Sequence, residues 1–171
     1  MVYGGLVNKN IVAGLQAYGQ NALGMTGADM NIIRSKKREK GDVDYGFVGD
    51  IESVDASAFS TLLKSDAVPV IAPLTHNGDG QLLNTNADTM ASAVASALAG
   101  TFRVTLVFCF ELKGVMMNVA DESSVIPLIT PESYQNLKAG KIVVDGMIPK
   151  LDNGFAALQK GVYQIRITNT D

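Results

Sequence analysis

Residues 90–110 form the stretch MASAVASALAGTFRVTLVFCF, which decides the fold class. Met90, Val94 and Leu98 recur at four-residue spacing, so they lie on one face of a predicted helix. The run 104–110 that follows is almost entirely apolar, which is typical of a central parallel strand buried on both faces. A helix that leads directly into such a strand predicts an α/β layered fold.

The same alternation of helix and strand patterns extends in both directions from this stretch. Helices are predicted over 7–18, from Asp55 through Leu63, from Thr130 to Gly140 and between Gly146 and Gly161. Further strands are predicted at Val68–Ala72, as a buried strand, and at Val162–Thr168. We therefore expect a three-layer α/β/α sandwich with a mostly parallel central sheet, in which Cys109 is a small buried residue.

Two features interrupt the alternation of helices and strands. Ile32–Arg34 and Tyr45–Ile51 are predicted to be the two arms of an excursion, joined by the charged loop Ser35–Asp44. The glycine-rich segment His76–Gly80 predicts a hairpin turn.

Composition excludes several classes of protein. The chain has 171 residues, of which 47% are hydrophobic and 18% charged, and this length suffices for one well-packed domain. A net charge of −3 argues against a nucleic-acid-binding surface. No apolar run approaches the roughly 20 residues of a membrane span, and no secretory signal opens the chain. One cysteine and one histidine argue against disulfides and a structural zinc site. We expect a cytoplasmic protein without protein-held metal.

The segment Asn84–Asp88 is the first candidate site. It links a short strand pattern to the helix that contains Met90, and backbone N–H groups at a helix start can hold an anion. The alternative is that Asn84 or Asn86 is only an N-cap and that Asp88 is a favourable first-turn carboxylate. Spacing alone leaves both interpretations open.

The segment Asp145–Lys150 is the second candidate. Because Pro149 is tolerated only in the first turn of a helix, Lys150 must also lie near the helix N-terminus. A cation there opposes the helix dipole by about 0.3–1 kcal/mol, and a bound anion would offset this. The alternative is a surface lysine whose stem packs while its ammonium group stays hydrated.

At these two candidates the sequence resembles the acetylglutamate kinases, a branch of the amino-acid kinase family. Four segments match in order, namely Gly4–Lys9, Ala22–Asp29, Gly80–Asp88 and Asp145–Lys150. The resemblance covers essentially the whole chain and implies the amino-acid kinase fold. It also implies that residues 1–88 belong to an acylglutamate-binding half and residues 89–171 to an ATP-binding half.

The resemblance implies a role for particular residues. Asn84, Asn86 and Ala87 would bind an N-acylglutamate. Asp88 would fix the catalytic lysines, and Lys150 would be one of those lysines and would touch the transferring phosphoryl group. ATP would be bordered by two segments, which comprise Glu111, Leu112, Lys113, Gly114, Val115, Met116, Ile142, Val143, Val144 and Met147.

The implied activity is ATP-dependent phosphorylation of the γ-carboxylate of N-acetyl-L-glutamate in arginine biosynthesis, with Mg²⁺ held largely by ATP. A succinyl or other acyl group on the acceptor is equally compatible with the sequence. Two alternatives stay open: another amino-acid kinase with a carboxylate, carbamate or nucleotide acceptor, and a non-catalytic nucleotide-binding fragment. The resemblance also implies a homodimer, through the helix near Val7–Tyr18.

The chain departs from the family pattern at three places. Phe110-Glu111 stands where many relatives have Ser-Asp or Thr-Asp, next to the ribose. A strand and a glycine-rich loop with a second catalytic lysine would precede the position of Met1, and a closing helix and strand would follow Asp171. We therefore expect a domain that is incomplete at both ends and a chain that is inactive by itself.

Overall fold

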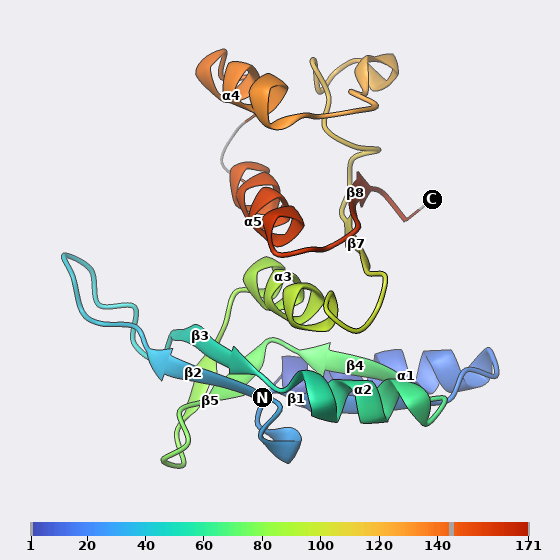
Figure 1. The fold of residues 1–171 in the computed structure, drawn as a ribbon, viewed down its shortest axis with the longest axis vertical. Helices are drawn as coiled ribbons and strands as arrows, with labels where there is room; N and C mark the ends of the chain where they lie inside the picture. The colour runs from blue at the N-terminus through green and yellow to red at the C-terminus, as the bar shows by residue number, and fades with distance from the viewer. Residues whose placement is uncertain (1, 144–145, 171) are drawn as a thin grey trace. The chain divides into compact units, whose positions relative to one another are not determined.

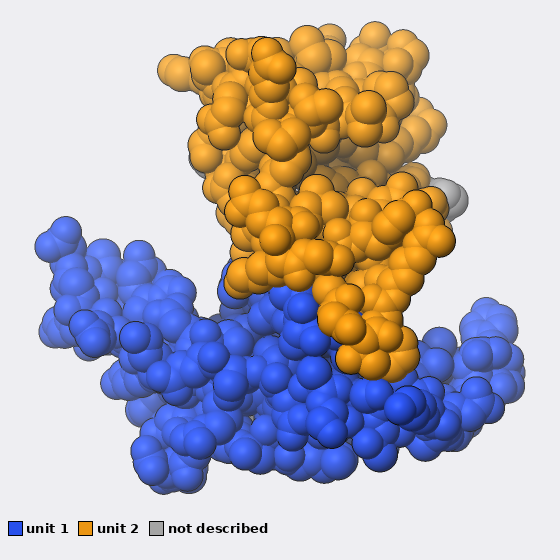
Figure 2. Space-filling view, in the orientation of Figure 1, with its two compact units in different colours: residues 1–98 blue, residues 99–171 orange. Residues whose placement is uncertain are grey.

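The computed structural model describes residues 2–143 and 146–170 and shows an α/β chain that divides into two compact units, 1–98 and 99–171 (Figures 1 and 2). The helices are η1 Tyr3–Val7, α1 Asn8–Ala17, η2 Asp29–Asn31, α2 Ala56–Lys64, α3 Ala87–Leu98, η3 Glu122–Ser124, α4 Pro131–Ala139 and α5 Ile148–Gln159. The strands are β1 Ala22–Thr26, β2 Ile33–Lys37, β3 Gly49–Val54, β4 Val68–Ala72, β5 Leu74–His76, β6 Leu82–Asn84, β7 Thr105–Cys109 and β8 Gln164–Thr168.

Unit 1 contains a parallel strand pair covered by a helix. β1 pairs with β4 in parallel, from Ala22 opposite Val68 to Thr26 opposite Ala72. Helix α1 lies against this pair, and its first residue, Asn8, is buried. The Asn8 side-chain amide donates a hydrogen bond of 2.8 Å to the Val70 carbonyl, which fixes the helix to β4.

A second, mixed sheet of unit 1 has the strand order β3-β2-β5-β6. β2 and β3 pair antiparallel, which confirms the two predicted arms of the excursion. β5 and β6 also pair antiparallel, and the predicted hairpin turn between them is confirmed. In that turn the Asn77 side-chain oxygen accepts hydrogen bonds from the backbone N–H groups of Asp79 and Gln81.

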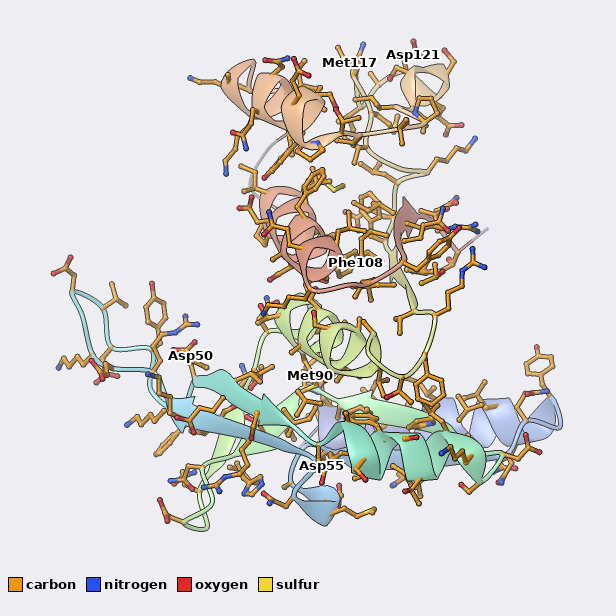
Figure 3. All side chains as sticks on the ribbon, in the orientation of Figure 1. Asp50, Asp55, Met90, Phe108, Met117 and Asp121 are labelled. Atoms are coloured by element: carbon orange, nitrogen blue, oxygen red, sulfur yellow. The ribbon has the colours of Figure 1, made fainter. Side chains whose placement is uncertain are left out.

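Two helices of unit 1 begin and pack as their sequences predict. Asp55 caps α2, since its carboxylate accepts the backbone N–H groups of Ser57 and Ala58 at 2.9 Å each. On α3, Met90 and Leu98 are buried, as the four-residue spacing predicts. Asp55 and Met90 are labelled in Figure 3.

Unit 2 combines the parallel pair β7–β8 with helices α4 and α5. Helix α4 begins with a capping box, in which Thr130 and Ser133 each bond the other's backbone N–H, and Pro131 follows in the first turn. The core of this unit consists of Val115, Tyr134, Leu137, Val143 and Leu151. The sequence-based boundary between halves lies at residue 88, whereas the structure divides the chain after α3.

The burial of the parallel strands differs from expectation. In β7, Phe108 is 5% exposed, but Val107 is 45% exposed and Cys109 is exposed as well. β7 pairs only with β8 among the described strands, and alternate side chains of a strand point to opposite faces. One face is therefore uncovered, and the prediction that Cys109 is buried is wrong. β4 is likewise only partly buried, because Val68 is 43% exposed.

Candidate active site

The segment Asn84–Asp88 joins β6 to α3, and its backbone is held on two sides. The Asn84 N–H donates to the Phe47 carbonyl at 2.8 Å, and the Thr85 N–H donates to the Pro73 carbonyl at 3.0 Å. The Thr85 side chain points inward, where its hydroxyl lies 2.9 Å from the buried Thr75 hydroxyl. With Thr85 turned inward, Asn84 and Asn86 on either side are both exposed.

Asn86 caps helix α3. Its side-chain oxygen accepts the backbone N–H of Thr89 at 2.9 Å and the Thr89 hydroxyl at 3.2 Å. Asn86 therefore acts as an N-cap, while Asn84 belongs to strand β6. The cap uses the oxygen of the Asn86 side-chain amide. The nitrogen of the same amide carries two N–H groups, which can donate hydrogen bonds to a ligand. Capping and ligand binding by Asn86 are thus compatible.

The other two predicted residues of this segment lie in the first turn of α3. Ala87 is exposed, and its backbone is at the N-terminal end of the helix, where N–H groups have no partner in the helix itself. Asp88 is half-buried in the same turn, where a carboxylate interacts favourably with the helix dipole. Unit 1 therefore brings Asn84, Asn86, Ala87 and Asp88 together at one strand–helix junction.

Lys150 lies in unit 2, in the first turn of α5, as the position of Pro149 predicts. Its side chain is half-buried, and its Nζ atom lies 5.7 Å from the centre of the Phe108 ring on β7. A cation at this distance from an aromatic face is attracted by the ring quadrupole. Lys150 thus lies in the first turn of α5, with its ammonium group close to β7 of the same unit.

The first half of the predicted nucleotide segment follows β7 at the surface. Glu111 and Lys113 are exposed and Leu112 is half-buried. The Lys113 ammonium lies 2.6 Å from a carboxylate oxygen of Glu122, and this hydrogen bond lowers the pKa of Glu122. Exposed ion pairs contribute little to stability, so Lys113 can exchange this partner for a ligand at small cost.

The other predicted nucleotide residues are mostly part of the core. Gly114, Val115, Met116 and Val143 are buried, and Ile142 and Met147 pack partly buried against the same cluster. Since these residues lie in or against the interior of unit 2, contact with a nucleotide would fall mainly to their backbone and to the exposed Glu111 and Lys113. Val144 lies outside the described residues.

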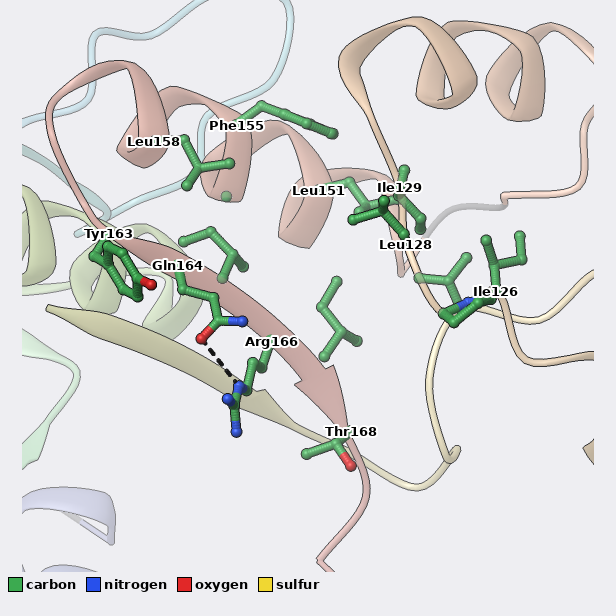
Figure 4. A pocket seen from close by; sticks show the side chains of 15 residues that line it. Ile126, Leu128, Ile129, Leu151, Phe155, Leu158, Tyr163, Gln164, Arg166 and Thr168 are labelled. Atoms are coloured by element: carbon green, nitrogen blue, oxygen red, sulfur yellow. Dashed lines mark hydrogen bonds between the residues drawn. The ribbon is translucent and has the colours of Figure 1, made fainter.

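A groove of about 600 Å³ in unit 2 was not anticipated from the sequence (Figure 4). It runs between α5, β8 and the segment 126–129, and Leu151, Phe155 and Ile167 are among its apolar walls. One polar wall is set by Gln164, whose side-chain oxygen accepts a 3.2 Å hydrogen bond from Arg166. Of the predicted nucleotide residues that the structure describes, only Val115 lines this groove, so the groove and the predicted ATP site are different places in unit 2.

A partly buried contact between α4 and α5 was also missed. The Tyr134 hydroxyl donates to Asp152 at 2.7 Å, and its ring stacks on Phe155 with 5.3 Å between centroids. The Lys138 ammonium lies 3.5 Å from the same carboxylate. Asp152 follows Lys150 by two residues on α5, so this contact holds the helix that carries Lys150. No local pattern signals it, because Tyr134 and Asp152 belong to different helices.

Comparison with known proteins identifies the family. A family model described as the amino acid kinase family matches residues 1–169. The chain belongs to the amino acid kinase family. Within it, the chain is 61% identical over 168 residues to the acetylglutamate kinase of Phocaeicola vulgatus, a match of 98% of this chain and 65% of that protein. It is 38% identical over 175 residues to the acetylglutamate kinase of Methanopyrus kandleri, a match of 100% of this chain and 70% of that relative.

Solved structures confirm the amino acid kinase fold. A protein of Streptococcus mutans superimposes with a TM-score of 0.82 at 28% identity, over 98% of this chain and 65% of that one. N-acetylglutamate synthase from Neisseria gonorrhoeae gives a TM-score of 0.80 at 20% identity, over 96% of this chain and 36% of that one, a likeness of fold alone. The chain spans about 65% of the length of the first of the curated relatives that it matches.

Residues 2–143 and 146–170 lack two features. Within this described part, no group of three or more His, Cys, Asp or Glu side chains is arranged to hold a metal ion. None of the described helices is long and apolar enough to cross a membrane.

The buried Tyr134 predicts a specific dependence of stability on pH. Burial and the hydrogen bond to Asp152 raise the pKa of Tyr134 to about 12, whereas an unfolded tyrosine titrates near pH 10. The stability linked to Tyr134 is therefore complete below about pH 10 and is lost as the pH rises towards about 12. We expect Tyr134→Phe to be less stable by about 1 kcal/mol at pH 7 and to lose stability less steeply above pH 10.

Urea unfolding from pH 7 to pH 12 measures both effects. Tyr163→Phe is the matched control, because Tyr163 lies in the same unit and is exposed. Parallel stability curves for Tyr134→Phe and the parent protein above pH 10 would contradict the assignment.

Proposed function

We propose that the protein is an acetylglutamate kinase, which transfers the γ-phosphoryl group of ATP to the γ-carboxylate of N-acetyl-L-glutamate or a related N-acylglutamate. The observation that carries the proposal is the similarity to acetylglutamate kinases along nearly the whole chain. The junction between β6 and α3 supports it, because it presents two amide side chains at a helix N-terminus. In a cell, such an enzyme would act in the cytoplasm, in arginine biosynthesis.

The acceptor would be held at the junction in unit 1. The side-chain amides of Asn84 and Asn86 offer donors and acceptors that match the amide and the α-carboxylate of an N-acylglutamate. The backbone at Ala87 adds N–H donors and the positive end of the helix dipole for an anionic group. An acceptor with two carboxylates and one amide therefore suits this set of groups.

The phosphoryl group would be stabilised by positive charge rather than by a covalent nucleophile. The acceptor carboxylate attacks the γ-phosphorus, the bond from that phosphorus to the β,γ-bridging oxygen breaks, and ADP leaves with the electron pair. In the transition state, negative charge develops on the equatorial oxygens of the transferring phosphoryl group. The Lys150 ammonium and the amide dipoles at the N-terminus of α5 would stabilise this charge. Asp88 would orient catalytic lysines. Since the acceptor is already a carboxylate, no strong general base is needed.

ATP would be bound by unit 2, between the segments 111–116 and 142–147. Glu111 and Lys113 offer side chains at the surface, and the buried residues of these segments offer backbone groups. Mg²⁺ would be held largely by the ATP phosphates, because this ion usually binds through substrate phosphates and few protein ligands. Bound in this way, Mg²⁺ supplies charge neutralisation between the phosphates.

A homodimer through α1 is the assembly that the surface supports. Along η1 and α1 the exposed apolar side chains include Tyr3, Leu6 and Ile11, and Leu6 is 65% exposed. Exposed apolar residues gathered on one element are typical of interaction surfaces. In a twofold-symmetric dimer, the same helix of a second copy would cover these side chains, and the apolar surfaces of both copies would be buried together.

Replacing Lys150 tests the catalytic assignment. In the protein as its gene encodes it, we expect Lys150→Ala to lower kcat by about 10²–10³ with much less change in the KM for N-acetylglutamate. The acyl phosphate formed from ATP and N-acetylglutamate is trapped with hydroxylamine and measured as hydroxamate. Lys160→Ala, at the other end of α5, is the matched control and should retain activity. Turnover of Lys150→Ala within a few-fold of the parent would remove Lys150 from the site.

Replacing Asp88 separates a catalytic from a structural carboxylate. Asp88→Asn preserves the shape of the side chain but removes its charge, so we expect a loss of turnover of at least about 10²-fold. A carboxylate that only complements the dipole of α3 would change stability by about 0.3–1 kcal/mol and leave the rate unchanged. Melting curves and rates are measured on the same preparation. Unchanged turnover with reduced stability would assign Asp88 to the helix alone.

A charge placed on η1, which leads directly into α1, tests the dimer. We expect Leu6→Lys to convert a dimeric protein to monomers in sedimentation-velocity experiments, because the lysine would be buried against an apolar partner face. Lys9→Glu would be a poor control, since the Lys9 ammonium bonds the Gly24 carbonyl. Leu63→Lys, which changes an exposed leucine of α2 in the same unit, is the better one. A monomeric parent protein would refute the proposal.

A further inference from the structure

The four-stranded sheet of unit 1 closes on itself beside the predicted acceptor residues. Its strand order leaves β3 and β6 at the two edges. These edges meet at a parallel bridge between Val48, which precedes β3, and Asn84, the last residue of β6. The hydrogen bond at this closure is the one from the Asn84 N–H to the Phe47 carbonyl, at 2.8 Å.

The inside of the closed sheet is packed around Gly49, the first residue of β3. A Cβ atom placed on Gly49 would lie 2.9 Å from the Leu83 Cβ, 3.0 Å from the Ser35 Cβ and 3.1 Å from the Thr75 Oγ1. These three residues come from the other three strands, and all of them are fully buried. Cβ contacts below 3.0 Å are essentially never found, so any side chain at position 49 must push strands apart.

Glycine is required at position 49 by steric crowding and not by backbone conformation. Gly49 is paired in a strand, and its φ is not in the left-handed region, whereas Gly46 in the same connection has a φ of 65°. An alanine at 49 would therefore suit the backbone conformation but not the interior. Because the nearest atom is on Leu83, the neighbour of Asn84, the strain would fall directly on the closure.

We propose that Gly49 is a positioning residue for the N-acylglutamate acceptor. Its lack of a side chain lets β3 approach β6 closely enough for Phe47 to hold the backbone of Asn84. Asn84 in turn presents its amide to the acceptor, so the inference rests on the proposed function. Gly49 itself touches no substrate and acts only through Asn84.

The variant Gly49→Ala, in the protein as its gene encodes it, tests this role. We expect the KM for N-acetylglutamate to rise about tenfold, since small displacements of a positioning group are costly, while the KM for ATP stays within twofold. Gly41→Ala is the matched control. It lies in the same connection between β2 and β3, and a Cβ there would meet no atom within 4 Å.

A second control separates positioning from loss of stability. Phe59 on α2 is fully buried in the same unit, so Phe59→Leu should lower the melting temperature without raising the KM for the acceptor. If Gly49→Ala gives no folded protein, Ser35→Thr adds one methyl group to the same interior from β2. That milder variant is then expected to raise the KM for N-acetylglutamate severalfold, again without an effect on ATP.

The outcomes distinguish the two proposals. A parent protein without N-acetylglutamate-dependent turnover overturns the proposed function and this inference with it. If the parent is active, the positioning role alone is overturned by either of two results. One is that Gly49→Ala, or Ser35→Thr in its place, leaves the acceptor KM within twofold or raises both KM values equally. The other is that Phe59→Leu, at a similar loss of melting temperature, raises the acceptor KM as much.

Discussion

The hydrogen bond from the backbone N–H of Asn84 to the Phe47 carbonyl is the constraint on which the candidate acceptor site depends. It fixes the end of β6, and the inward turn of Thr85 fixes the next residue through its hydroxyl contact with Thr75. Asn86 then begins α3 by capping it. Each of the three residues is thus anchored by a different contact, and the two asparagines flank the anchored Thr85.

The helices could be predicted from sequence because their signals are local. Asp55 and Thr130 are caps that act within three residues, and the spacing of Met90 and Leu98 reports one face of one helix. Burial of the strands could not be predicted in the same way. An apolar run such as 104–110 shows that a strand tolerates burial, but whether both faces are covered depends on elements elsewhere in the chain, which is why Cys109 is exposed.

In the candidate site, too, the features that depend on near neighbours in the sequence could be predicted, and contacts between distant residues could not. The placement of Asn86 at a helix start and of Lys150 behind Pro149 follows from short-range rules, and both are confirmed. The Tyr134–Asp152 contact, which braces α5, joins two helices and has no local signature. The nucleotide segments show a further limit, because a resemblance assigns whole segments. The structure distinguishes exposed Lys113 from buried Val115 within one of them.

The closure of the mixed sheet also bears on how the chain folds. Phe47 and Asn84 are separated by 84 − 47 = 37 positions, so their bond can form only after a long loop has been closed. The β2–β3 hairpin and helix α3 depend on near neighbours and can form early, whereas contacts between distant positions form slowly. We therefore expect the candidate acceptor site to become ordered late, after the secondary structure that surrounds it. For a chain emerging from the ribosome, helices and hairpins would then exist before the bond between Phe47 and Asn84.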